Sequence, residues 1–301
     1  MNNKWPSLKQ LHYLVTLHDV RHFNRAARAC YVSQSTLSSG IQSLEERLGC
    51  TLIKRDHKSF IFTPSGEEVV KRARELLART LDLTDFAASQ TAEMEGQLRV
   101  GCIPTIAPFL LCDLVKQVQQ RYPKLELVLR EDTTSVLIDA LKGGQLDVLL
   151  LALPVDIHGL HSRIVGRDKF KMVLPKALAS QLHMPLDFNQ LPDGSVYLLE
   201  REHCLTEHAL TACHLAYSDK INPFTATSLH TLVQMVANGL GTTFVPQMAI
   251  RQGLVQNLDL VITDPPHAPA YRDIGLVWRP SSSRVNTFSK LGEIVGELLN
   301  E

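Results

Sequence analysis

The chain has 301 residues, of which 45% are hydrophobic and 21% charged, and its formal net charge is zero. That length exceeds what one hydrophobic core usually serves, so two or three domains are expected. No apolar run reaches the roughly eighteen residues that span a bilayer, and the N-terminus lacks the apolar core of a signal peptide. We therefore expect a cytoplasmic protein with no membrane partner, in which the six cysteines rest as reduced thiols.

The zero net charge hides an uneven distribution along the chain. Residues 1–66 contain nine lysines and arginines and four acidic residues, a formal charge of +5, which leaves −5 for the remainder. A basic N-terminal unit on a mildly acidic body favours a polyanion such as DNA as the partner of the N-terminus. Many solvated helical faces are also basic, so charge alone does not decide the partner.

The basic segment has the pattern of a helix-turn-helix. Apolar residues at helical spacing predict helices at 8–15 and 23–30, and a third helix that starts at the N-cap Ser33 and ends at Gly49. The small pair Ala26 and Ala27 lets the second and third helices approach closely. A recognition helix touches bases and phosphates with its N-terminal end, where short polar side chains suit that role. The residues expected there are Ser33, Gln34, Ser35, Thr36 and Ser38.

A β-hairpin and a long helix follow. The hairpin is predicted over 51–63, with Arg55 and Lys58 at its tip, placed to reach phosphates as a wing. Ser65 and Glu68 have the spacing of a capping box that opens the helix. The helix fits self-dimerisation or packing on its own domain, and its position between two domains favours a dimer that reads a pseudo-palindromic DNA site. Its apolar stripe is Val69, Ala73, Leu76, Thr80, Leu83 and Ala87.

The rest of the chain alternates apolar strands with amphipathic helices. This alternation predicts a parallel sheet with helices on both faces. Roughly 200 residues of this kind suit two α/β lobes with a ligand-binding crevice between them. The expected strands are 97–103, 125–129, 147–152, 171–174, 196–199, 242–245 and 274–278, and the expected helices are 108–122, 135–141, 228–238 and 285–299.

Two cysteines in the body, Cys204 and Cys213, lie nine residues apart in a histidine-rich stretch. That separation spans a few helical turns or a short loop, so the sulfurs can meet after local refolding. A neighbouring cation favours a reactive thiolate, and Arg201 and His203 are placed to act in this way. The alternative is that both cysteines are buried apolar filler.

No motif of an enzyme is present: the sequence lacks a Gly-rich phosphate loop, HExxH, Gly-x-Ser-x-Gly and paired CxxC. We therefore expect no catalytic activity and no cofactor. A soft metal ion is a weaker alternative, because zinc sites usually have tighter ligand pairs, and we expect none. Its ligands would be His203, Cys204, His208, Cys213 and His214.

A set of motifs runs through the N-terminal unit: Ala26-Ala27, Ser33-Gln34, Ser38, Ile41, Leu44-Glu45, Leu48-Gly49, Leu52-Ile53-Lys54-Arg55 and Thr63-Pro64-Ser65-Gly66. These motifs resemble the winged helix-turn-helix of LysR-type transcriptional regulators. The resemblance implies an α/β protein with an N-terminal winged helix-turn-helix, a long linker helix, and a two-lobed regulatory domain similar to a periplasmic binding protein. The implied boundaries are 1–64, 65–95 and 96–301, with one lobe at 97–167 plus 270–301 and the other at 168–269.

The body resembles the peroxide-sensing members of that family. Gly101-Cys102-Ile103-Pro104-Thr105, His203-Cys204-Leu205 and Cys213 carry this resemblance. It implies that Cys204 is the peroxidatic cysteine and Cys213 the resolving one, joined reversibly by a disulfide. One departure is Thr206, which stands where those regulators often have an arginine, so a cation near Cys204 is missing. The polar shell implied for peroxide and thiolate is Thr105, Thr134, His203, Glu207 and Arg272.

The resemblance implies a DNA-binding regulator that senses hydrogen peroxide, assembles as a homotetramer of two dimers and works with RNA polymerase. One alternative is a LysR-type regulator of a small metabolite bound between the lobes, with structural cysteines. Another is a thiol peroxidase, which would leave the N-terminal unit unexplained. The other four cysteines, Cys30, Cys50, Cys102 and Cys112, are expected to be buried filler.

Overall fold

The structure is a computed structural model, and the residues that it describes are 5–55, 60–89, 93–183, 185–200, 204–213, 215, 219–266 and 269–300. The chain divides into two compact units. One is formed by residues 1–91 with 140–145 and 281–283, and the other by 92–139, 146–280 and 284–301. Within the described ranges, no helix is long and apolar enough to cross a bilayer.

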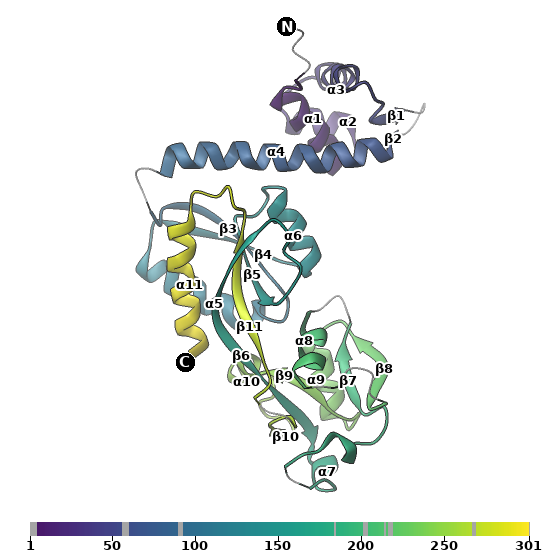
Figure 1. Ribbon diagram of the computed structural model, residues 1–301, viewed down its shortest axis with the longest axis vertical. Coiled ribbons are helices and arrows are strands. Elements are labelled where there is room, and N and C mark those ends of the chain that lie inside the picture. Colours follow the sequence, from purple (N-terminus) through teal and green to yellow (C-terminus); the bar gives the residue numbers. More distant parts are fainter. Residues whose placement is uncertain are drawn as a thin grey trace. The chain divides into compact units, whose positions relative to one another are not determined.

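The N-terminal unit is a helix-turn-helix followed by a hairpin and a long helix (Figure 1). Leu37, Ile41 and Leu44 of the third helix are completely buried in its core. Ser33 caps that helix by accepting a hydrogen bond from the N–H of Thr36 at 3.1 Å, and Gly49 ends it with φ 67°, which confirms both predicted ends. The elements are α1 (Leu8–Val20), α2 (Phe23–Ala29), α3 (Gln34–Leu48), β1 (Ile53–Arg55), β2 (Phe60–Phe62) and α4 (Pro64–Ser89).

The start of α4 differs from the prediction. The helix begins at Pro64, and the hydroxyl of Thr63 accepts from the N–H of Gly66 at 2.9 Å, so Thr63 and not Ser65 is the cap. Proline suits the first helical position because its φ is already helical. A Cβ at Gly66 would lie 2.1 Å from the carbonyl oxygen of Leu52, so this start requires a glycine against the hairpin.

The second unit is built on a seven-stranded sheet in the order β10-β6-β11-β5-β3-β4, with β9 also paired to β6. A separate parallel pair is formed by β7 and β8. The strands are β3 (Gly96–Cys102), β4 (Leu125–Glu131), β5 (Val148–Leu153), β6 (His161–Pro175), β7 (Val196–Leu199), β8 (Ile221–Ala226), β9 (Thr243–Pro246), β10 (Leu260–Thr263) and β11 (Tyr271–Trp278). The helices are α5 (Ala107–Arg121), α6 (Thr134–Lys142), α7 (Lys176–Ala179), α8 (Cys204–Ala212), α9 (Leu229–Ala237), α10 (Gln247–Arg251) and α11 (Val285–Asn300), with a 3-10 turn at Phe188–Gln190.

The predicted parallel pairing is correct for β3, β4 and β5 but wrong for the rest of the seven-stranded sheet. β3 is parallel to β4 and β5, but β11 runs antiparallel to β5 and β6, and β6 antiparallel to β9 and β10. The connection from β5 to β6, residues 154–160, contains no helix. β5 and β6 run in the same direction with β11 between them, so the antiparallel pairing here comes from β11, which enters the sheet from the C-terminal part of the chain.

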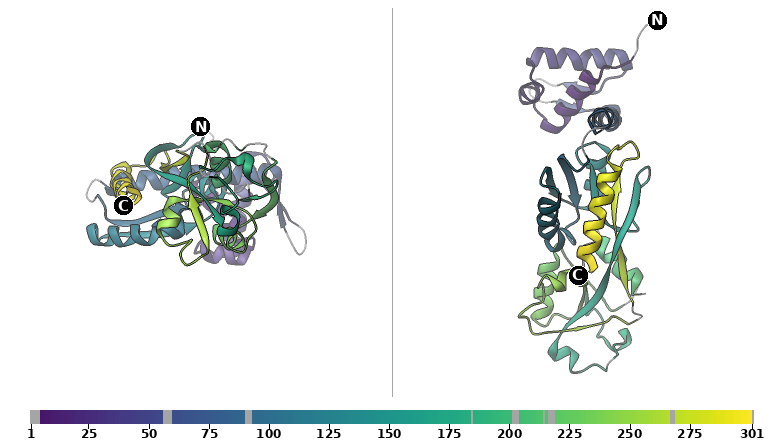
Figure 2. Two further views of the ribbon diagram at one scale, coloured as in Figure 1. Left: turned by 90° about the horizontal axis from the view of Figure 1, so that it is seen from below. Right: turned by 90° about the vertical axis from the view of Figure 1, so that its left-hand side faces the viewer.

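The 15-residue strand β6 is much longer than the predicted segment 171–174. Its first part, through Lys169, pairs with β11, and its last part, from Phe170, pairs with β9 and β10. One strand therefore belongs to both halves of the sheet. Helix α11, drawn in yellow, packs against α5 and β6 (Figures 1 and 2).

Candidate functional site

Helix α8 places Cys204 and Cys213 at its two ends. Cys204 is its first residue, and Cys213 continues the helix by donating its N–H to the carbonyl of Ala209 at 2.9 Å. Nine residues of helix separate two Cα atoms by about 14 Å, whereas a disulfide needs about 4.4–6.8 Å. Both thiols are free, so this is the dithiol form of the protein. A disulfide between these residues therefore requires α8 to unfold.

The groups around the Cys204 sulfur shift the pKa of its thiol in opposite directions. Burial raises the pKa of the Cys204 thiol, and this is the largest effect. The positive charge of Arg272, a hydrogen bond from the Thr134 hydroxyl and backbone N–H groups, including that of Ala152, all act to lower the same pKa. The balance leaves the pKa above its ordinary value. Cys204 therefore rests as a thiol, with donors already in place for the negative charge of a thiolate.

Arg272, on β11, connects several groups of this site and has only 2% of its surface exposed. Its Nε donates to Oδ2 of Asp168 at 3.1 Å, and its Nη1 donates to the hydroxyl of Thr105 at 2.8 Å. The other oxygen of Asp168 accepts from the N–H of Met248 at 3.0 Å. Because the Thr105 hydroxyl accepts from Arg272, it keeps its own hydrogen for another acceptor, such as a bound oxygen.

The structure thus places Thr134 and Arg272 beside Cys204, and it places Thr105 on the guanidinium of Arg272. Glu207 is different: its side chain is exposed, and in the described part of the chain its charge acts on His208. The remaining residue expected in this shell, His203, lies outside the described residues.

Cys213 is completely buried at the far end of α8. Burial raises the pKa of its thiol to about 12, so almost no thiolate exists there at neutral pH. Cys213 can act as a nucleophile only after it has left this position.

Two residues of α8, Thr206 and His208, make contacts that the sequence did not indicate. The hydroxyl of Thr206 is buried and donates to the carbonyl of Leu199 at 2.8 Å. Nε2 of His208 lies 2.9 Å from the carbonyl oxygen of Pro154, directly after β5. A carbonyl only accepts, so Nε2 carries the hydrogen. Thr206 therefore replaces the missing cation with a backbone anchor. The only sequence signal for His208 is its spacing of four from Cys204.

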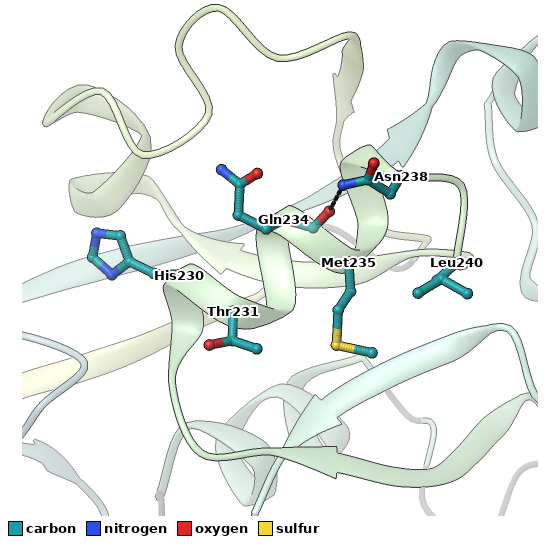
Figure 3. A pocket seen from close by; sticks show the side chains of 6 residues that line it. All are labelled: His230, Thr231, Gln234, Met235, Asn238 and Leu240. Atoms are coloured by element: carbon teal, nitrogen blue, oxygen red, sulfur yellow. Dashed lines mark hydrogen bonds between the residues drawn. The ribbon is translucent and has the colours of Figure 1, made fainter.

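A metal site finds no support in the described ranges, where no three His, Cys, Asp or Glu side chains gather in a way that could hold an ion. His203 and His214 of the considered ligand set lie outside those ranges. A separate open hollow of about 530 Å³ lies on α9 and the turn after it (Figure 3). Its lining comes from one helix and one turn and includes no residue of the Cys204 site. The lining residues are His230, Thr231, Gln234, Met235, Asn238 and Leu240.

The expected DNA-contacting residues lie at the start of α3, where Ser33, Gln34, Ser35 and Thr36 are exposed. Ser38 is partly buried and accepts a hydrogen bond from Nη1 of Arg55 at 2.7 Å.

Arg55 lies in strand β1 and not at the hairpin tip, which corrects its predicted place. Its guanidinium lies over the ring of Phe23 at 5.1 Å, so it is held beside the recognition helix. Lys58 lies outside the described residues.

The other cysteines divide into two groups. Cys102 is buried, and Cys30 and Cys50 are partly buried against the N-terminal core. Cys112 is exposed on α5, so the expectation that it is buried is wrong. The buried face of that helix includes Leu110, Leu111 and Leu114, and Cys112 points to the opposite side.

Known proteins resemble this chain over nearly its whole length. The HTH-type transcriptional regulator EstR of Acinetobacter baylyi is 39% identical over 291 residues, which is 96% of each chain. The hydrogen peroxide-inducible genes activator of Haemophilus influenzae is 34% identical over 97% of this chain and 96% of that protein. The reduced regulatory domain of OxyR2 from Vibrio vulnificus is 64% identical, with a TM-score of 0.68, and covers 69% of this chain and 97% of that one.

Two family models match the chain in succession. The bacterial regulatory helix-turn-helix protein, lysR family, matches residues 8–67, and the LysR substrate binding domain matches residues 91–300. The second match alone spans more than half of the 301 residues. The chain therefore belongs to the LysR family of bacterial regulatory helix-turn-helix proteins.

Proposed function

We propose that this protein is a DNA-binding transcriptional regulator that detects hydrogen peroxide through Cys204 and answers with a reversible Cys204–Cys213 disulfide. The observation that carries the proposal is that Thr134 and Arg272 lie beside the Cys204 sulfur and stabilise its thiolate. A second thiol, that of Cys213, lies at the other end of the same helix. The peroxide-inducible activator and OxyR2 among its relatives support the same reading.

The chemistry proceeds in two balanced steps. The Cys204 sulfur attacks one oxygen of peroxide, the O–O bond breaks, and a sulfenic acid and water are formed. The sulfur loses two electrons, and the leaving hydroxide takes the proton of the thiol. Arg272 and the hydroxyls of Thr105 and Thr134 donate to the developing negative charge. In the second step Cys213 attacks the sulfenic sulfur, and a second water leaves as the disulfide forms.

The second step requires α8 to unfold, and this gives the switch two discrete states. In the proposed architecture two lobes like those of a periplasmic binding protein, 97–167 plus 270–301 and 168–269, change their packing when α8 leaves its place. The linker 65–95 would carry the change to DNA-binding domains at 1–64. Thiol systems of the cytoplasm would reduce the disulfide and reset the protein.

The active assembly proposed is a homotetramer of two dimers on pseudo-palindromic promoter DNA, working with RNA polymerase and not as an enzyme. Exposed apolar residues of α4 support self-association through that helix. They are Leu76, Leu81 and Leu83.

The test is a free-thiol count and a promoter assay on the full chain before and after one equivalent of peroxide. Wild type is expected to lose two thiols and to change promoter output. Cys204→Ser is expected to lose both responses, and Cys213→Ser to stop at a sulfenic acid that dimedone traps. A promoter response that survives in Cys204→Ser would refute the proposal and favour a metabolite regulator. Rapid peroxide turnover without any effect on transcription would favour a thiol peroxidase.

A further inference from the structure

We propose that His208 is a positioning residue that holds helix α8 in its dithiol place, and that protonation of His208 releases the helix for disulfide formation. The chemical consequence rests on the proposed function. The anchoring itself is a property of the reduced protein and does not need peroxide.

The anchor is a hydrogen bond from a buried imidazole to a strand end. His208 has 9% of its surface exposed, and its Nε2–H donates to the carbonyl of Pro154, which directly follows β5. A second bond, from Thr206 to Leu199, ties the first turn of α8 to the end of β7. His208 lies about one turn after Cys204 and about one and a half turns before Cys213. It therefore holds the part of the helix that keeps the two sulfurs apart.

The second nitrogen of His208 makes this anchor sensitive to acid. Nδ1 is buried and has no hydrogen-bond partner in the described structure. Protonation would place a hydrogen and a positive charge on an atom with no acceptor. Such a charge is costly when it is buried and unpaired, and it is avoided if the imidazole moves into water.

The charged groups around His208 do not offset this cost. Arg272 of β11 repels a second positive charge, while Asp273 of β11 and Glu207 of α8 attract it. Asp273 is already paired with Arg167 at 3.0 Å, and the Glu207 side chain is exposed. Burial is the largest influence and lowers the pKa of His208 below its ordinary value.

The sign of the pH effect follows from that shift. A histidine on a released α8 titrates with the ordinary pKa of about 6.5, whereas the anchored one resists protonation. The anchored state is therefore fully favoured above about pH 6.5 and loses ground as the pH falls below it, by up to about tenfold per pH unit. The disulfide step uses the released helix, so acid raises the fraction of protein ready for that step.

The experiment reads the release of α8 directly, without peroxide. Cys213 is completely buried, so its alkylation by iodoacetamide reports the released helix. The full-length protein would carry Cys204→Ser, which removes disulfide chemistry, and labelling of the Cys213 peptide would be followed by mass spectrometry from pH 7.5 to 5.5. This background would be combined with His208→Gln, His208→Leu and, as a matched control, Thr206→Val. Glutamine keeps an N–H donor for Pro154 but does not titrate, so the rate ratio of the His208 protein to the Gln variant cancels the thiol chemistry of Cys213.

The labelling rate of the His208 protein divided by that of the Gln variant is expected to rise about threefold to tenfold from pH 7.5 to pH 5.5. The Leu variant is expected to label faster than the His208 protein at pH 7.5, because it lacks the anchor. Thr206→Val is expected to label faster at every pH and to keep the rise, because it loosens α8 while retaining the imidazole. The inference would be overturned if the rate ratio did not change with pH, or if the Leu variant labelled no faster than the His208 protein. It would also be overturned if Thr206→Val lost the rise at low pH.

Peroxide oxidation of the wild-type protein, measured beside the alkylation series, separates this inference from the proposed function. If the alkylation results are as expected but peroxide fails to oxidise wild-type Cys204, the anchor stands and the peroxide function fails. If Cys204 is oxidised and joined to Cys213 while the alkylation rate of Cys213 is the same in the His208 variants and their parent, the function stands and the anchor fails.

Discussion

Helices α3 and α8 both begin with the residues for which we propose a partner, yet the two helices are held in place in different ways. Helix α3 is 15 residues long and rests on the completely buried apolar side chains of Leu37, Ile41 and Leu44. Helix α8 has nine residues, and two of its four buried side chains are the polar Thr206 and His208. Apolar burial does not change with proton concentration near neutrality, whereas a hydrogen bond from imidazole does. The position of α3 therefore does not depend on pH near neutrality, whereas we propose that the position of α8 does.

Arg272→Gln is the substitution expected to disturb the surroundings of Cys204 most strongly while leaving α3 unchanged. This change leaves Asp168 buried without its cation, which is expected to destabilise the second unit by roughly 3–5 kcal/mol. It also removes the charge that lowers the pKa of Cys204, so that pKa rises further and alkylation of Cys204 at pH 8 slows. Urea unfolding and a pH–rate profile of Cys204 alkylation measure the two effects. An unchanged profile would show that Arg272 does not act on the thiolate.

Leu44→Ala makes the corresponding change in α3. It opens a cavity in the N-terminal core and is expected to cost roughly 2–4 kcal/mol of unfolding free energy. Binding of promoter DNA should fall with it, while the labelling rate of Cys213 stays as in wild type. Thermal unfolding of the full chain and a fluorescence DNA-binding assay give the measurements. A faster Cys213 label in this variant would contradict the independence of the two helices.

Alkaline solution distinguishes the helices without any mutation. The Cys213 thiol has its pKa raised to about 12 by burial, whereas a released Cys213 ionises near 8.5. The released form loses its proton first, so the docking of α8 is fully stable below about pH 8.5 and weakens above it by up to about 1.4 kcal/mol per pH unit. Hydrogen exchange of α8 amides at pH 8 and 10, corrected for intrinsic exchange, is expected to show this loss and α3 to lack it. Equal loss in both helices would indicate general unfolding.

The smallest expected effect concerns the cap of α3. Ser33→Ala removes the acceptor for the N–H of Thr36 and should cost about 1 kcal/mol. Ser33→Asp, which can cap equally well, is the control for stability. If both variants bind DNA as weakly as each other while only alanine is less stable, Ser33 contacts DNA as well as capping the helix.

Much of the N-terminal unit could be predicted from local signals. Ser33, Gly49 and the apolar spacing of α3 act through contacts within a few residues, so the sequence shows them directly. The start of α4 was predicted wrongly because Thr63, Pro64 and Ser65 all suit a helix start, and contact with the hairpin decides among them.

The sheet and the surroundings of Cys204 depend on contacts between residues far apart in the chain. Local sequence patterns therefore predicted them less well. Antiparallel pairing of β11 joins residues more than a hundred positions apart, as in the bond between Arg272 and Asp168. A resemblance indicated Arg272 and Thr134, but nothing local pointed to Asp168 or to the carbonyl of Pro154. The sequence does not distinguish His208 from the other histidines, because its partner, the carbonyl of Pro154, lies more than fifty residues away in the chain.

The position of the two thiols at opposite ends of α8 also has a consequence for the reduction potential of the switch. The disulfide can exist only if the helix is lost, so every bond that stabilises docked α8 favours the dithiol. For a two-electron couple, each 1.4 kcal/mol of such stabilisation raises the potential by about 30 mV and makes the disulfide easier to reduce. Thr206 and His208 exchange no electrons, yet through their carbonyl partners they determine how oxidising the cell must become before the disulfide persists.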